Sequence, residues 1–185
     1  MTSLTNGMSR SLDDLVPDFR EKVVATLAAC EGQGILMRPY CTLRDPWSQA
    51  RLYREGRILA ELEGAIAMLK SSGAPFLAKV LIKLLEVDGP QAGTARIITN
   101  ALPGYSWHQW GEAIDCYCDI GGRADWGAPS AYAVYAESAR SQGLTAGHFW
   151  KMKDSVHIQL RKGGSARDVY SVPEIDDEMA RRFTA

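Results

Sequence analysis

The chain has 185 residues, of which 46% are hydrophobic and 23% charged, with a formal net charge of −1 and a pI near 6.3. This balance excludes the broad basic surface of a nucleic-acid-binding protein, and no stretch reaches the roughly 20 apolar residues of a membrane span. A chain of this length can bury the core of a globular domain. We therefore expect a single domain over residues 1–185, present as a monomer.

The N-terminus lacks the pattern of a secretory signal, because residues 1–10 contain no basic stretch followed by an apolar run. We therefore expect synthesis in the cytoplasm, so that any action outside the membrane requires a separate export route. In that compartment cysteines stay reduced. The four cysteines have no Cys-x-x-Cys spacing, and we predict that they serve in packing: Cys30, Cys41, Cys116 and Cys118.

Helical spacing dominates the first half of the chain. Apolar residues at helical intervals predict a helix over residues 11–31, followed by a short strand over 35–41 and a short helix over 46–56. Two further amphipathic helices within 58–87, separated by a break at 71–75, predict a helical hairpin. The hairpin is best interpreted as a cap on the core, and a lid or a partner surface is the alternative.

Strand patterns dominate the second half. A short strand is predicted over residues 95–100, and strict alternation of apolar and polar residues predicts strands over 112–120 and 156–160. A helix over 130–142 separates these two alternating strands, and a short helix is expected near residues 174–183.

Two of the three histidines lie beside carboxylates at these strands. Alternation places Asp115 and His157 on polar strand faces, and His108 lies in the loop before the first of these strands. If the strands pair, the three side chains can converge, and two imidazoles with one carboxylate suit a catalytic zinc with an open fourth position. Asp154 would lie in the turn entering the second strand and could act as a general base. Because an aspartate is a weak base at neutral pH, the metal must supply most of the activation.

The third histidine, His148, has no carboxylate at a comparable spacing. We interpret it as a structural or substrate-facing residue. A single histidine is more often a surface or core residue than a metal ligand. The metal hypothesis therefore depends on the joint pattern of His108, Asp115 and His157.

The motifs SxHxxGxAxD at residues 106–115 and DxxH at 154–157 resemble a known family of zinc peptidases. It comprises D-alanyl-D-alanine carboxypeptidases and L-alanyl-D-glutamate endopeptidases, includes many phage endolysins, and shares its fold core with the hedgehog signalling domain. The resemblance covers roughly residues 18–162. It implies an α+β fold, with a small antiparallel sheet flanked by helices, in which 58–87 is an inserted hairpin and 163–185 a polar tail.

The resemblance also implies roles for individual residues. One Zn²⁺ is held by three side chains: His108, Asp115 and His157. Asp154 is then the catalytic base, and Arg44 binds and polarises the substrate. A guanidinium at this place can grip a substrate carboxylate with two hydrogen bonds or stabilise a tetrahedral oxyanion. Ser106 and Gln49 match motif positions that line the site.

The function that follows is hydrolysis of the peptide stems of bacterial peptidoglycan by a zinc metallopeptidase. An aspartate at the base position is more similar to the L-alanyl-D-glutamate endopeptidases, so we expect a bacteriolytic, endolysin-like enzyme that acts on the cell wall after release through a holin pore or another export route. The alternatives are a D-alanyl-D-alanine carboxypeptidase or dipeptidase, and a non-catalytic zinc-stabilised binding module. The presence of both Asp154 and Arg44 argues against the binding module, which needs no base.

Overall fold

The structure, a computed structural model, describes residues 7–90, 93 and 96–184. The chain divides into two compact units. We call residues 8–43 and 110–162 the sheet unit, and Gly7 with the described residues of 44–109 and 163–184 the helical unit. The elements are those of the predicted α+β class. Among the described residues, none of the helices has the length and apolar character needed to span a bilayer.

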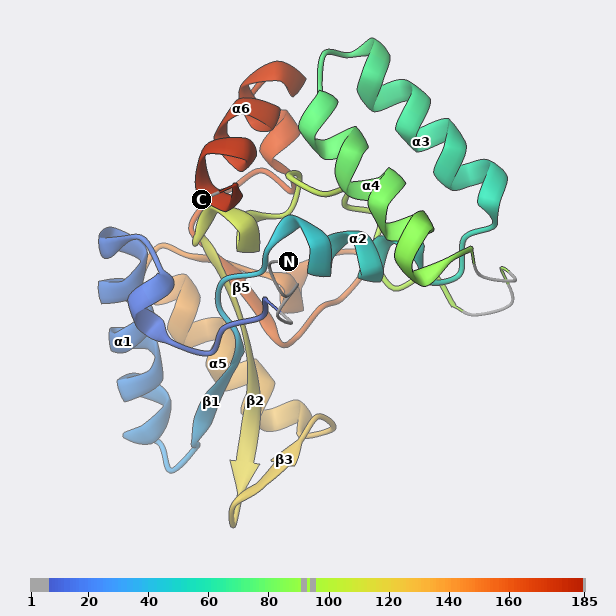
Figure 1. Cartoon of the computed structure of the whole chain (residues 1–185). Helices are drawn as coiled ribbons and strands as arrows, with labels where there is room; N and C mark the ends of the chain where they lie inside the picture. The colour runs from blue at the N-terminus through green and yellow to red at the C-terminus, as the bar shows by residue number, and fades with distance from the viewer. Residues whose placement is uncertain (1–6, 91–92, 94–95, 185) are drawn as a thin grey trace. The chain divides into compact units, whose positions relative to one another are not determined.

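The sheet unit is built on a five-stranded antiparallel sheet (Figure 1). Its strands are β1 (Met37–Cys41), β2 (Ala113–Ile120), β3 (Arg123–Asp125), β4 (Thr145–Ala146) and β5 (His157–Gln159). The order is β1-β2-β5-β4, with β3 also paired to β2. Asp115 in β2 is paired with Cys41 of β1 and also with His157 of β5. Since a residue has one neighbour on each side, β1 and β5 flank the same part of β2.

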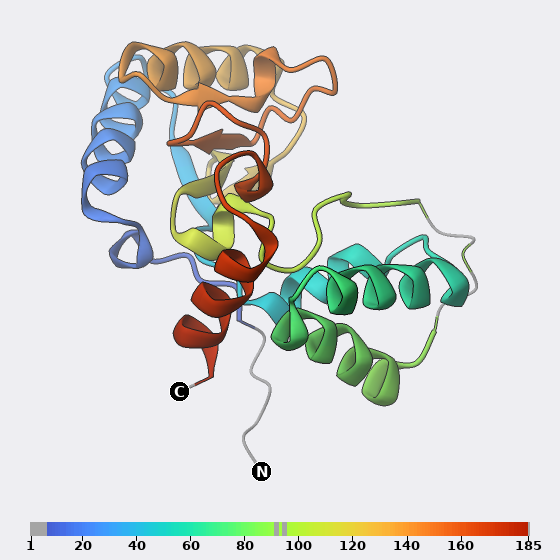
Figure 2. The same cartoon turned by 90° about the horizontal axis from the view of Figure 1, so that it is seen from above.

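Two helices pack on the sheet and form the core of this unit. They are α1 (Pro17–Glu31) and α5 (Pro129–Ser141), which lie side by side (Figure 2). Each begins with proline, whose missing N–H costs nothing in the first turn of a helix. The core joins side chains from both helices and from the apolar faces of β2 and β5, among them Phe19, Val23, Ile114, Cys116, Tyr135 and Ile158. Burying each large side chain stabilises the unit by about 1.5–3 kcal/mol.

The chain makes two short features that the sequence patterns did not indicate. A 3-10 helix, η1 (Leu12–Asp14), precedes α1, so the helix predicted over 11–31 begins only at Pro17. Gly121 and Gly122 both have positive φ, at 61° and 82°, and turn β2 directly back into β3. Two consecutive residues with positive φ form a tight hairpin turn, which favours glycine at both positions.

The described residues of the helical unit form four α-helices: α2 (Pro46–Arg54), α3 (Leu59–Ser71), α4 (Pro75–Asp88) and α6 (Val172–Phe183). The predicted hairpin is confirmed as α3 and α4, and the predicted C-terminal helix as α6 (Figure 1). The carboxylate of Asp176 in α6 accepts hydrogen bonds from the backbone N–H groups of Phe76 and Leu77, at 3.1 and 2.8 Å. It thereby caps the first turn of α4, where those N–H groups have no partner within the helix.

The strand predicted over 95–100 is wrong for the residues that the structure describes, 96–100, which form no strand. Side chains take the place of a strand partner. Arg57 donates to the carbonyl of Thr99 at 2.9 Å and to the side-chain oxygen of Asn100 at 3.1 Å, and its guanidinium lies over the Tyr53 ring. Ala95, the first residue of the predicted strand, lies outside the described residues, as do residues 1–6 of the N-terminal segment.

All four cysteines are buried, and none of them forms a disulfide. Burial raises the pKa of the Cys116 thiol to about 12, and it also raises the pKa of Cys30. At neutral pH these groups therefore remain protonated and behave as apolar side chains.

Glu178 in α6 is expected to contribute stability that is lost in acid. Hydrogen bonds from Arg181 and Arg182 lower the pKa of Glu178 from 4.5 to about 2. Because the folded pKa is the lower one, the contribution is complete above pH 4.5 and is lost as the pH falls towards about 2. Glu178→Gln should lower the free energy of unfolding at neutral pH by about 0.5–1 kcal/mol and leave it nearly unchanged at the acid end. Urea denaturation across this range, with the exposed neighbour variant Asp177→Asn as control, measures the difference; equal losses at every pH would contradict it.

Candidate active site

Three side chains of the sheet unit share one face at the centre of the sheet. Asp115 lies opposite Cys41 on one side and His157 on the other, and directly paired residues point to the same face. The register of β1 shifts between Pro39 and Cys41, which makes Tyr40 the extra residue of a β-bulge. A bulge redirects side chains, and this one brings Cys41 onto the face of Asp115. A ligand atom of Cys41 lies within 4.8 Å of one of Asp115.

His157 is held between two oxygen atoms. Its Nδ1 lies 2.9 Å from Oδ1 of Asp115, and its Nε2 lies 3.0 Å from Oε1 of Gln159. The amide of Gln159 donates through Nε2 to the carbonyl of Arg161 at 2.7 Å, so its oxygen is the atom that faces the imidazole. Nε2 of His157 therefore carries a hydrogen and donates to Gln159, and this assigns the neutral ring a lone pair on Nδ1.

Nδ1 of His157 lies 2.9 Å from Oδ1 of Asp115, so a doubly protonated ring donates to this carboxylate, whereas in the neutral ring both atoms are acceptors. A proton or a metal cation between them satisfies both. A histidine that binds a metal through one nitrogen and donates its other N–H to an oxygen is the usual arrangement in metal sites. The geometry of the sheet unit thus fits a metal, with Gln159 as the group that orients the imidazole.

Three described residues offer candidate metal donors: Cys41 and Asp115 in the sheet unit, and His108 in the helical unit. Sulfur, nitrogen and oxygen donors of this kind are those that zinc accepts. His108 lies in the 3-10 helix η2 (Trp107–Trp110). The last residue of η2, Trp110, is the first residue of the sheet-unit segment that continues into β2. Cys41, which we had assigned to packing, was missed as a donor because only the bulge in β1 places it opposite Asp115.

Asp154 lies in the turn entering β5, as its position in the sequence predicted, and its side chain is exposed. Its N–H donates to the carbonyl of Gly147 at 2.9 Å, and its carbonyl accepts from the N–H of His157 at 3.3 Å. A Cβ at Gly147 would lie 2.4 Å from the Asp154 carbonyl oxygen, so only glycine permits this close approach. The turn therefore fixes Asp154 relative to His157.

His148 belongs to the same stretch of the sheet unit, and its Nδ1 lies 3.0 Å from the Ser155 hydroxyl. Burial lowers the pKa of His148, and the positive charge of Lys153 lowers it further. These contacts favour the structural interpretation of His148, as a residue that fixes the turn carrying Asp154.

In the helical unit, the backbone N–H of Arg44 donates to the carbonyl of His108 at 3.3 Å. The Arg44 guanidinium donates through Nη1 to Oε1 of Gln49 at 3.0 Å, and Gln49 donates through Nε2 to the carbonyl of Ala101 at 2.8 Å. Gln49 is fully buried, so this amide holds one arm of the guanidinium in a fixed direction. Ser106 is half-buried at the turn that leads into η2.

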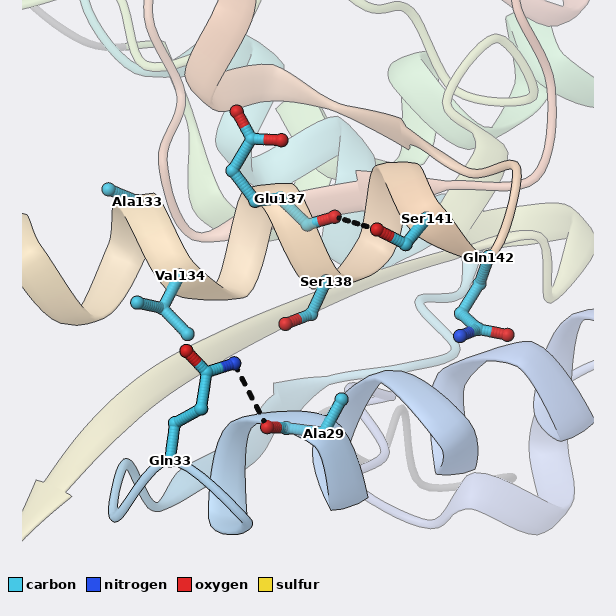
Figure 3. Close-up of a pocket in the computed structure, with 8 residues that line it drawn as sticks. All are labelled: Ala29, Gln33, Ala133, Val134, Glu137, Ser138, Ser141 and Gln142. Atoms are coloured by element: carbon cyan, nitrogen blue, oxygen red, sulfur yellow. Dashed lines mark hydrogen bonds between the residues drawn. The ribbon is translucent and has the colours of Figure 1, made fainter.

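A pocket of 460 Å³ in the sheet unit lies elsewhere, between α1 and α5 (Figure 3). Its lining contains no histidine or cysteine and only one acidic residue, Glu137. Two of its polar side chains bond back to their own helices, since Gln33 donates to the carbonyl of Ala29 and Ser141 to that of Glu137. The pocket offers no convergent donors for a metal or a peptide.

Replacing Gln159 is expected to weaken metal binding without removing a ligand. Gln159→Leu removes the acceptor that fixes the Nε2–H of His157, and loss of such a partner typically costs about 10- to 100-fold in metal affinity. Competition of zinc with a chromogenic chelator measures the affinity, and Gln33→Leu, in the pocket between α1 and α5, is the matched control. An unchanged affinity in Gln159→Leu would contradict the role of Gln159 as the group that orients His157 for metal binding.

Residues 13–154 match the VanY family, described as D-alanyl-D-alanine carboxypeptidases. The chain belongs to the VanY family. The match includes six of the predicted site residues: Arg44, Gln49, Ser106, His108, Asp115 and Asp154. It ends before His157, for which the evidence is the strand pairing with Asp115. The chain is thus a peptidoglycan peptidase of the VanY family, and its candidate metal donors include a cysteine, a histidine and an aspartate.

Among solved structures, the chain is similar to the L-Ala D-Glu endopeptidase ChiX of Serratia marcescens. The two are 17% identical, and the similarity covers 90% of this chain and 96% of that one, with a TM-score of 0.42. No curated protein sequence matches the chain significantly.

Proposed function

We propose that this VanY-family protein is a zinc-dependent endopeptidase that cuts the L-alanyl-D-glutamate bond of peptidoglycan stems. The observation that carries the zinc dependence is the pair formed by His157 and Asp115. Nδ1 of His157 and Oδ1 of Asp115, two atoms that zinc accepts as donors, lie 2.9 Å apart, and Nε2 of His157 lies 3.0 Å from Oε1 of Gln159. This is the arrangement of a metal ligand with its orienting partner.

The proposed zinc ligands are the three side chains of the motif: His108, Asp115 and His157. When bound, zinc supplies a Lewis acid that polarises the scissile carbonyl and activates water. Cys41 is a further donor on the same sheet face as Asp115. The strand pairing that holds Asp115 and His157 supports the proposal, because it fixes both groups before any metal arrives.

Asp154 is proposed as the group that moves protons. Its carboxylate is exposed and is placed by the turn just before β5, three residues from His157. In this role it takes a proton from the attacking water and gives it to the leaving amine. Its position outside the paired strands keeps it distinct from the ligand pair.

Arg44 is proposed to bind the stem peptide. Its guanidinium is oriented by Gln49, which is itself fixed through Ala101. A guanidinium held in this way suits a substrate carboxylate or the oxyanion formed during hydrolysis. Gln49 then acts through Arg44. Ser106 is proposed as a further residue that lines the site.

The second candidate function is a D-alanyl-D-alanine carboxypeptidase, which differs from the proposed endopeptidase in the bond that it cuts. The aspartate at the base position supports the endopeptidase, whereas the description of the matched family favours a D-alanyl-D-alanine carboxypeptidase. We further propose that the enzyme reaches the wall from the cytoplasm through a holin or another export route.

Digestion of purified peptidoglycan by the zinc-loaded protein tests both candidates. The endopeptidase creates new D-glutamate amino termini, and the carboxypeptidase releases free D-alanine. A zinc-loaded protein that releases neither would support the non-catalytic binding module instead.

A further inference from the structure

Three aromatic side chains of the sheet unit gather beside the candidate metal pair. The rings of Tyr40 and Trp126 meet edge to face, with centroids 4.9 Å apart and planes at 85°. Tyr117 approaches the same indole, with centroids 5.7 Å apart and planes at 48°. We call these three residues the aromatic platform. Trp126 is 49% exposed and the two tyrosines are half-buried, so the platform presents a ring surface to solvent.

The platform lies on the sheet face that carries the candidate ligands. Tyr117 follows Asp115 by two residues in β2, and residues two apart in a strand point to the same face, about 7 Å apart. The bulge in β1 places Tyr40 next to Cys41, and the contact of Tyr40 with Trp126 shows that it joins the same cluster. Tyr117 therefore places one edge of the platform about 7 Å from Asp115 along β2.

Polar groups border the rings. Arg38 is paired with Tyr117 in register and forms an ion pair with Asp119 at 3.4 Å, in which the arginine side chain is 51% exposed. The guanidinium of Arg10 lies over the Tyr40 ring, 5.3 Å from its centroid, so it covers one face of Tyr40, and the 49% exposed indole of Trp126 offers the main stacking surface. Flat apolar faces bordered by donors and acceptors match a sugar ring, whose C–H face is apolar and whose rim carries hydroxyl and amide groups.

We propose that the aromatic platform is a subsite that stacks an N-acetylhexosamine ring of the glycan strand. Its part in catalysis rests on the proposed function. The L-alanine of the stem is joined to the lactyl group of N-acetylmuramic acid, so cleavage after that alanine in the intact wall places a sugar close to the metal. Cleavage between the terminal D-alanines lies several residues from any sugar. A sugar subsite beside Asp115 thus favours the L-alanyl-D-glutamate bond.

Sugar binding is tested without any reliance on hydrolysis. The probe is a tetramer of N-acetylglucosamine, titrated into the full-length protein while the indole N–H signal of Trp126, assigned with Trp126→Phe, is followed by NMR. A saturable shift of this signal is expected, and Tyr117→Ala should weaken the binding about tenfold. Ile120→Ala is the matched control, because Ile120 is an exposed apolar residue of the same strand on the alternate face and should bind as wild type. A Trp126 signal that the tetramer does not move overturns the proposal.

Hydrolysis then tests the role of the subsite. The substrates are a disaccharide-peptide and the same peptide without sugars. Trp126→Ala should lower kcat/KM about tenfold on the first and leave the second unchanged, and Trp126→Phe should retain most of the activity. Equal losses on both substrates would show that Trp126 only supports the fold and would overturn the subsite. Failure of the wild-type protein to cut either substrate would instead refute the proposed function, while the NMR titration decides the subsite separately.

Discussion

Asp154→Asn is expected to lower kcat on peptidoglycan peptides by about a thousandfold while the protein keeps its zinc. Asparagine has nearly the shape of aspartate but cannot accept a proton from water or return it to the leaving amine. The backbone bonds of Asp154 to Gly147 and His157 do not involve the carboxylate, so the turn should survive the substitution. Activity on a stem peptide and zinc content by elemental analysis are measured on the same preparation.

The matched control for this prediction is Asp177→Asn, which removes an exposed carboxylate from α6 in the helical unit. It should leave both activity and zinc content at the wild-type level. Loss of zinc in Asp154→Asn would make Asp154 a ligand rather than a base. Activity within about twofold of wild type would assign proton transfer to another group.

The elements that could be predicted from sequence are those whose pattern is local. The hairpin over 58–87 was predictable because each of its helices has apolar residues at helical spacing, and the structure confirms it as α3 and α4. The strand β2 was predictable because alternation separates Ile114 from Asp115. In both cases the burial of one face decides the structure. The apolar residues of that face recur at regular intervals within a short stretch of sequence, so they can be recognised there.

The features that were missed depend on residues far apart in the chain. Residues 96–100 have a strand-like composition, but Arg57, about forty positions earlier, bonds to Thr99 and Asn100 and gives them a partner outside any sheet. The hairpin into β3 was missed because three residues are too few to show alternation. No local pattern could have indicated either result.

The candidate site shows the same division. The motif places His108, Asp115 and Asp154, and the family match covers all three. The orientation of His157 could not be predicted, since it depends on the amide of Gln159 being turned by the carbonyl of Arg161. The identity of the scissile bond could not be predicted from the motif either. The motif residues act on the reacting carbonyl, whereas the choice of bond depends on side chains that contact the rest of the substrate.

His157→Ala is expected to weaken zinc binding by more than about a hundredfold and to abolish hydrolysis. Structural zinc sites with four ligands contribute roughly 10–16 kcal/mol, or about 3 kcal/mol for each ligand. The other histidine of the sheet unit provides the control: His148→Ala removes an imidazole that lies against Ser155 and should retain zinc. Zinc affinity is measured by competition with a chelator. Equal effects of the two substitutions would mean that His157 is not a ligand.

Cys41 decides which donors complete the site, because it and His157 flank Asp115 from opposite strands. If the motif residues are the ligands, protein loaded with Co²⁺ shows no sulfur-to-cobalt charge-transfer band, and Cys41→Ser leaves its spectrum and its metal affinity unchanged. If sulfur binds the metal, the band is present in the wild-type protein and disappears in Cys41→Ser. We expect the first result, because the 2.9 Å approach of His157 to Asp115 and its bond to Gln159 already provide an oriented ligand on that side. A charge-transfer band would make the thiolate a ligand, and His157→Ala would then be expected to retain the metal.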